Sequence, residues 1–166
     1  YSIEGYSLYT VGNEQYLLAG TTLANIHAYK INPKTQSLSS AGYVVDNQGI
    51  ALRNPAIHGY LTYFNGTGPK GLIVSSEGGI FFYRSNQKKN SKGNIILNAP
   101  SHLLQTNPDL YGSSLVVPNL VDWDGDGDLD IISGTSLGHI WLFENVGTNQ
   151  QPLYQPGVNL KAGGYD

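Results

Sequence analysis

The stretch that decides the fold runs from Ile131 to Phe143 and reads IISGTSLGHIWLF. A short apolar run leads into a small-residue turn and then a second run of β-branched and aromatic residues, which is typical of a β-hairpin. The segment Leu17–Tyr29, LLAGTTLANIHAY, matches it without a gap. A third copy, Leu72–Ser75 followed by Gly78–Tyr83, fits after deletion of one turn residue. The chain therefore carries a repeated β-hairpin, and such a repeat organises a whole fold.

Further strands are expected on both sides of each hairpin. The copies start 55 (72 − 17) and 59 (131 − 72) residues apart, which leaves room for two more short strands in each unit. The expected flanking strands, in chain order, are Ile3–Tyr9, Gly42–Val45, Ile57–Phe64, Asn94–Leu97, Leu115–Val121 and Pro152–Tyr154. The best candidate for a helical turn is Ser101–Gln105. Four strands in a unit of about 55 residues predict a β-propeller blade.

We therefore predict an all-β chain in which residues 1–166 form a single segment of three blades, each of four antiparallel strands. The approximate blade boundaries are 1–46, 47–98 and 99–166. Propellers typically close with about four to eight blades, and closure is what hides their edge strands. Three blades are thus expected to be part of a larger ring or to pack against other blades or chains, with an open array as the alternative.

Composition narrows the class of protein. A chain with 40% hydrophobic and 13% charged residues is globular rather than disordered. It has no cysteine, which excludes disulfides and thiolate metal sites. No apolar run is long enough to span a membrane, and the chain begins within an expected strand with no signal peptide before it. We expect a mature or excised piece of a longer product.

Acidic residues are concentrated in one loop. Five of the twelve acids lie between Asp122 and Asp130, so the remainder of the chain carries a net charge of 9 − 7 = +2. Carboxylates packed this closely repel one another unless a cation joins them. The basic residues form no stripe, and the short basic loop containing Arg84, Lys88, Lys89 and Lys92 is expected to be solvated. The charge pattern therefore indicates a cation site and no nucleic-acid partner.

The loop DWDGDGDLD places an oxygen ligand at every second position from Asp122. Calcium takes six to eight oxygens, which alternate side chains on a curled loop can supply. The twelfth position, where an EF-hand places its closing glutamate, is Ser133, and no helices are expected beside the loop, so Asp130 at the ninth position must close the site. Magnesium retains more water and is less well matched. We predict one calcium ion, held by the side chains of Asp122, Asp124, Asp126 and Asp130 and the carbonyl of Asp128.

The segment from Asn119 to Gly134, NLVDWDGDGDLDIISG, together with Gly138–Gly147, GHIWLFENVG, resembles the FG-GAP/VCBS-type repeat. The resemblance is specific over about residues 118–156 and weaker over the two earlier copies. The second copy has lost every carboxylate of the loop, and the first retains only Gly12 and Glu14. It implies a calcium-bound β-propeller, found among surface proteins, lectins, integrin heads and some polysaccharide lyases, and a variant that looks bacterial. It also implies ligands at the first, third, fifth and ninth loop positions and the seventh carbonyl, which are the residues named above.

The resemblance implies a secreted or cell-surface segment, or a periplasmic one, that serves binding, adhesion or scaffolding with a protein or glycan partner. The alternative is part of a polysaccharide lyase or another carbohydrate-active enzyme. Catalysis has little support in the residues, because the sequence shows no nucleophile elbow, zinc-binding histidine pair or Walker loop. No catalytic residue is predicted.

Overall fold

The structure, a computed structural model, describes residues 3–21, 25–53, 60–64, 70–75, 80–103, 106 and 117–161. These residues form three antiparallel sheets and no helix, so the predicted all-β class is confirmed. None of the three sheets closes on itself. In the described residues no helix is long and apolar enough to cross a membrane.

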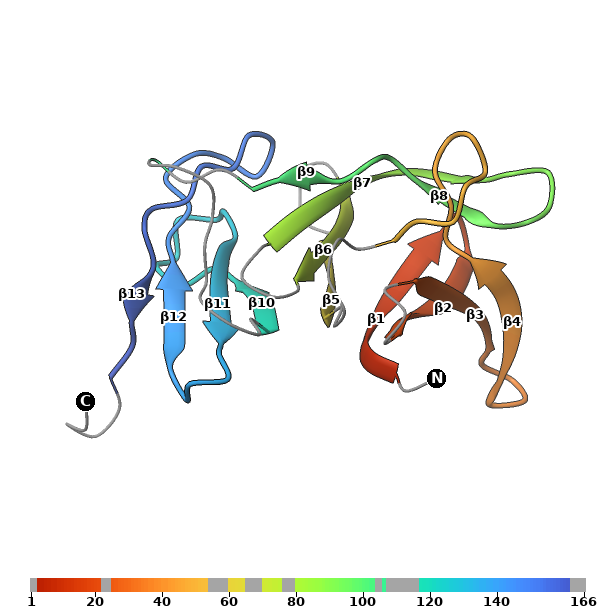
Figure 1. Ribbon diagram of the computed structural model, residues 1–166, viewed down its shortest axis with the longest axis horizontal. Helices are drawn as coiled ribbons and strands as arrows, with labels where there is room; N and C mark the ends of the chain where they lie inside the picture. Colours follow the sequence, from red (N-terminus) through yellow and green to blue (C-terminus); the bar gives the residue numbers. More distant parts are fainter. Residues whose placement is uncertain are drawn as a thin grey trace.

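The strands follow one another in sequence order within each sheet. The first sheet contains β1 (Ile3–Val11), β2 (Glu14–Thr21), β3 (Ile26–Asn32) and β4 (Ser37–Tyr43). The second contains β5 (Tyr60–Phe64), β6 (Gly71–Ser75), β7 (Ile80–Lys89), β8 (Ile95–Leu97) and β9 (Ser101–His102), the last pairing with β7. The third contains β10 (Val117–Val121), β11 (Asp130–Gly134), β12 (Ile140–Phe143) and β13 (Val158–Asn159). Figure 1 shows the three sheets side by side along the long axis, with the second sheet in the middle.

The three hairpins share one register, which confirms the repeat found in the sequence. Equivalent pairs close the base of each hairpin: Leu17 with Tyr29, Leu72 with Tyr83, and Ile131 with Phe143. Equivalent pairs also border each turn: Gly20 with Ile26, Ser75 with Ile80, and Gly134 with Ile140. The side chains of the three hairpins therefore point to equivalent faces of their sheets, because strand side chains alternate with a period of two.

The outer strands differ from the sequence-based expectation. In the first sheet β4 ends at Tyr43, where the expected strand was only beginning. In the third sheet Pro152–Tyr154 makes a single isolated bridge, between Tyr154 and Asn145, and the outer strand β13 lies at Val158–Asn159. Of the expected helical turn Ser101–Gln105, Ser101–His102 forms β9, and residues 104–105 lie outside the described part of the chain. These strands are short or polar, so their sequences carry little of the alternation that identifies a buried strand.

Two hydrophobic cores hold the sheets together. The first lies between the first and second sheets and the other between the second and third. β5 contacts both β1 and β10, which places the first strands of the sheets beside one another. The arm made by the distal part of β7 and by β8 reaches back to the first sheet, where Val45 bonds to the backbone of Ile95 and Leu97 (Figure 1).

Candidate metal centre

The acidic loop joins two paired strands of the third sheet. β10 ends at Val121 and β11 begins at Asp130, and these two residues are opposite each other across the ladder. Within the loop Gly125 and Gly127 have φ angles of 84° and 93°, a left-handed region that glycine enters without steric cost. These two glycines curl the chain, so that alternate side chains of the loop can converge.

Three of the predicted ligands do converge. Asp122, Asp124 and Asp126 are exposed, and each has a carboxylate oxygen within 4.8 Å of the other two. The loop also organises them through its own backbone: Gly125 N–H donates to Asp122 Oδ1 at 2.8 Å, Asp126 N–H to Asp124 Oδ1 at 3.1 Å, and Asp128 N–H to Asp126 Oδ1 at 2.9 Å. Hard oxygen ligands gathered on one exposed loop can hold a divalent cation.

Asp130 also accepts structural hydrogen bonds, which the sequence did not predict. Its side chain is buried, with 1% of its surface exposed. Oδ2 accepts the N–H of Trp123 at 2.8 Å, and Oδ1 accepts the N–H of Asn145 at 2.8 Å. Asp130 therefore ties the start of the acidic loop to the chain that leaves β12, outside the cluster formed by the three exposed aspartates. Each oxygen keeps a second lone pair, so these bonds are compatible with a cation contact.

Asn145 and Asn149 also hold the loop, and the sequence reasoning gave neither of them a role. Both are buried. Leu129 N–H donates to Asn149 Oδ1 at 2.9 Å, and Asn149 Nδ2 donates to the carbonyl of Gly127 at 3.0 Å. Asn145 Oδ1 accepts the N–H groups of Gly147 and Leu153. The only sequence signal was the Glu-Asn-Val-Gly segment within the matching repeat.

The carboxyl group of Asp128 lies in surroundings that oppose its ionisation. Burial raises the pKa of its carboxyl to about 6, and the neighbouring charges of Asp126, Asp130, Asp124 and Asp122 add to the shift. Its Oδ1 is buried and has no hydrogen-bond partner among the described residues. A buried carboxylate oxygen without a donor, two residues from Asp126, is a group whose negative charge a cation held by the loop would stabilise. The residues present therefore fit a divalent cation.

The matching positions of the other two sheets show what is special about this loop. The pairs Tyr9–Tyr16, Phe64–Gly71 and Val121–Asp130 are equivalent, so six residues separate the partners in the first two sheets and eight in the third. The acidic loop is thus two residues longer than its counterparts. Gly71 occupies the position of Asp130 in the second sheet, where a Cβ atom would approach the Phe82 ring and the Tyr83 carbonyl to 2.5 Å.

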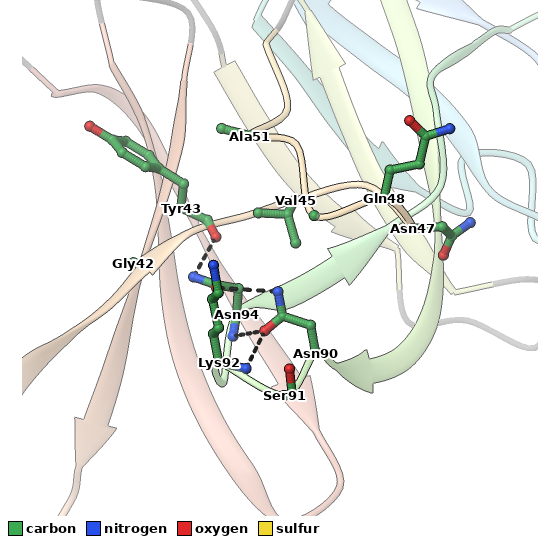
Figure 2. Close-up of a pocket in the computed structure, with 11 residues that line it drawn as sticks. Gly42, Tyr43, Val45, Asn47, Gln48, Ala51, Asn90, Ser91, Lys92 and Asn94 are labelled. Carbon is green, nitrogen blue, oxygen red and sulfur yellow. Dashed lines mark hydrogen bonds between the residues drawn. The ribbon is translucent and has the colours of Figure 1, made fainter.

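A polar pocket of about 520 Å³ lies elsewhere, between the first sheet and the arm of the second (Figure 2). Much of its amide lining is engaged internally. Asn94 Nδ2 donates to the carbonyl of Tyr43 at 3.2 Å, and Asn90 Oδ1 accepts the N–H groups of Lys92 and Asn94. Gln48, Ser91 and Lys92 add amide, hydroxyl and ammonium groups to the rim.

Comparisons with family models, with characterised proteins and with solved structures found no match to this chain. None of these comparisons identifies the FG-GAP/VCBS-type repeat, so the resemblance stays a prediction from the sequence.

Proposed function

We propose that the chain is a segment of a calcium-stabilised extracellular β-propeller that serves binding, adhesion or scaffolding. The observation that carries the proposal is the convergence of Asp122, Asp124 and Asp126 on a loop that two left-handed glycines curl. Such a loop concentrates negative charge, and a cation that binds only the folded loop stabilises the fold by mass action.

Calcium suits this loop better than magnesium. The loop can supply several protein oxygens in a flexible, partly exposed arrangement, whereas magnesium demands near-ideal octahedral geometry and retains several waters. The three exposed carboxylates would bind the ion, with Asp130 and the carbonyl of Asp128 completing the protein share of the ligands. When bound, the cation supplies positive charge that offsets the repulsion among the aspartates.

A thermal melt with and without calcium tests the proposal. We expect the melting temperature to rise on addition of calcium to chelator-treated protein and to fall again with excess chelator, while magnesium at the same concentration has a smaller effect. A melting curve that calcium and chelator leave unmoved would refute the proposed site. Isothermal titration of the metal-free chain then gives the stoichiometry, which we expect to be one ion per chain.

The polar pocket supports a glycan as one class of partner. Sugar hydroxyl groups both donate and accept, so they match the mixed amide, hydroxyl and ammonium groups of Gln48, Ser91 and Lys92. A glycan array followed by titration of the best ligand tests this assignment. Gln48→Ala combined with Lys92→Ala should abolish binding, and the matched control, Lys34→Ala on the exposed turn between β3 and β4, should bind as the parent chain does. Equal binding by the double variant would locate the glycan elsewhere.

A further inference from the structure

The polar pocket lies between two turns of the same design. One turn, residues 46–50, follows the first sheet, and the other, residues 90–94, joins β7 to β8. In each turn the first residue donates its N–H to the carbonyl of the fifth at 2.9 Å, and its own carbonyl accepts the N–H of the fourth at 3.0 Å. The fourth residue is a glycine, with a φ angle of 82° at Gly49 and 86° at Gly93. Two opposite walls of the pocket are therefore built alike.

The side chain of the first residue also fixes each turn. Asp46 Oδ1 accepts the N–H of Gln48 at 2.8 Å, and Asn90 Oδ1 accepts the N–H of Lys92 at 3.0 Å. The same two oxygens also accept the N–H of the fifth residue of their turns, at 2.9 Å in both. Gln48 and Lys92 thus occupy equivalent third positions, and their backbone is held in place before any ligand binds. A site organised in advance loses less conformational freedom on binding.

The wall formed by the arm is joined to the first sheet beside Gly42. Asn94 Nδ2 donates to the carbonyl of Tyr43 at 3.2 Å, and Asn94 Oδ1 accepts from Asn90 Nδ2 at 3.3 Å (Figure 2). A Cβ atom at Gly42 would approach Asn94 Nδ2 to 2.5 Å, so only glycine leaves room for this contact. The separation of the two walls is therefore set by contacts within the protein.

Only part of the polar lining is available to a ligand. Three lining amides are already engaged in hydrogen bonds inside the protein: Asn47, Asn90 and Asn94. Three other lining side chains make no hydrogen bond or ion pair with the described residues: Gln48, Ser91 and Lys92. Gln48 belongs to one turn, and Ser91 and Lys92 belong to the other (Figure 2). The available groups therefore come from both walls.

These available groups favour an anionic ligand. An ammonium group only donates, whereas an amide and a hydroxyl both donate and accept, so donors outnumber acceptors in this set. Among the described residues that line the pocket, Lys92 is the one charged side chain. The carboxylate of Asp46 lies outside the lining, and its Oδ1 is directed into its own turn. The chain as a whole carries a net charge of −3, so a preference for anions would be local to this pocket.

We infer that the pocket binds a saccharide through an anionic group, a carboxylate or a sulfate ester, held by Lys92 and Ser91. The inference rests on the proposed glycan partner and adds the charge of that ligand. Donors bind carboxylate and sulfate oxygens more strongly than neutral hydroxyl groups, because charge shortens and strengthens the hydrogen bond. Gln48, which both donates and accepts, suits the neutral hydroxyl groups of the same sugar.

A glycan array in chelator, followed by titration, tests the inference. Chelator prevents a cation on the acidic loop from bridging to the ligand. We expect the glycans that bind to carry a carboxylate or a sulfate. Glucose, glucuronate and glucose 6-sulfate differ only at C6, and NMR spectra of the backbone amides of Gln48 and Lys92 report their binding, as for the matching galactose series. The charged sugars should bind about fivefold more tightly than the neutral ones, as expected for an exposed ion pair, and the tighter of the two identifies the anionic group.

Substitutions at Lys92 separate its charge from its other contacts. Lys92→Gln should remove the preference for charged sugars, and Lys92→Arg should keep it. The matched control, Lys34→Gln on the exposed turn between β3 and β4, should bind as the parent chain does. Unchanged melting curves would show that the variants are folded. Equal binding of neutral and charged sugars, or a preference that survives in Lys92→Gln, would overturn the inference and leave the glycan partner standing. A chain that binds no glycan on the array would overturn both.

Discussion

The first and third sheets place negative charge at equivalent positions and surround it with different groups. Glu14 is the first residue of β2, directly after the turn that follows β1, and it pairs with Lys30 of its own sheet and with Lys89 of the second. These ammonium groups, Lys30 first, and the hydroxyl of Tyr16 lower the pKa of Glu14 to about 2. The acidic loop lies between β10 and β11 at the equivalent place, and the charges that act on Asp128 there are all those of other aspartates.

The comparison separates a connection that the chain's own lysines neutralise from one for which we propose an external cation. In the first sheet the chain supplies its own cations, and the connection between the strands is tight. In the third sheet the connection is two residues longer and holds four carboxylates, with a fifth at Asp130, the first residue of β11. An external cation would take the place of the lysines. The shift at Asp128 opposes ionisation and the shift at Glu14 favours it, so the two connections should respond to pH in opposite directions.

The largest effect is expected from Asp130→Ala. The change removes the acceptor for the backbone N–H groups of Trp123 and Asn145, and hydrogen bonds to a charged group contribute about 1.5–3 kcal/mol each, so we expect a loss of roughly 3 kcal/mol or more. Urea unfolding in chelator measures it without any metal contribution. Asp126→Ala, which removes one exposed contact, should cost less than about 1 kcal/mol under the same conditions. Equal losses in the free energy of unfolding would mean that the hydrogen bonds of Asp130 stabilise the fold no more than the exposed contact of Asp126 does.

Replacing Asp124 and Asp126 together by asparagine should remove the stabilisation that calcium provides and leave the fold intact. Asparagine keeps the Oδ1 atoms that accept the loop N–H groups but lacks the charge. The parent chain should gain about 2.7 kcal/mol when calcium is present at one hundred times its Kd, and the double variant should gain almost nothing. In chelator the variant should be at least as stable as the parent, because repulsion is relieved. A retained calcium response would place the ion outside this loop.

A smaller effect is expected from the titration of Asp128. Its folded pKa is raised from 3.8 to about 6, so the folded state binds more protons between these values. In chelator, stability should therefore fall as the pH rises from about 4 to about 6. Melting temperatures over this range should show the slope in the parent chain and lose it in Asp128→Asn. Parallel profiles for the two chains would contradict the assignment.

The smallest effect is expected at Glu14, because exposed ion pairs contribute little and are screened by salt. Its pKa is lowered from 4.5 to about 2, so its contribution is present above pH 4.5 and is lost as the pH falls toward 2. Glu14→Gln should flatten that loss at low ionic strength. The control is Glu144→Gln, at an exposed glutamate beyond β12. If this variant flattens the loss of stability at low pH equally, the loss is not specific to Glu14.

The sequence predicted what depends on local pattern. The hairpins were found because their apolar runs and turns repeat, and Asp122, Asp124 and Asp126 because their spacing is regular. β4 was misplaced because SLSSAGY lies on an edge where nearly every residue is partly or fully exposed. The roles of Asn145 and Asn149 could not be predicted, since they depend on a contact between the acidic loop and a segment about twenty residues further along the chain. The calcium ion remains a prediction.

The bonds made by Asn145 and Asn149 have a kinetic consequence. They connect the acidic loop to the segment from Asn145 to Tyr154, and Tyr154 also donates its hydroxyl to the Leu129 carbonyl. The two segments should then open as a single cooperative unit, visible in the exchange of backbone amides with heavy water. A cation held by the loop should slow exchange equally in the Asn145–Tyr154 segment, although that segment contains no carboxylate. Resistance to proteolysis should follow the same cation dependence there.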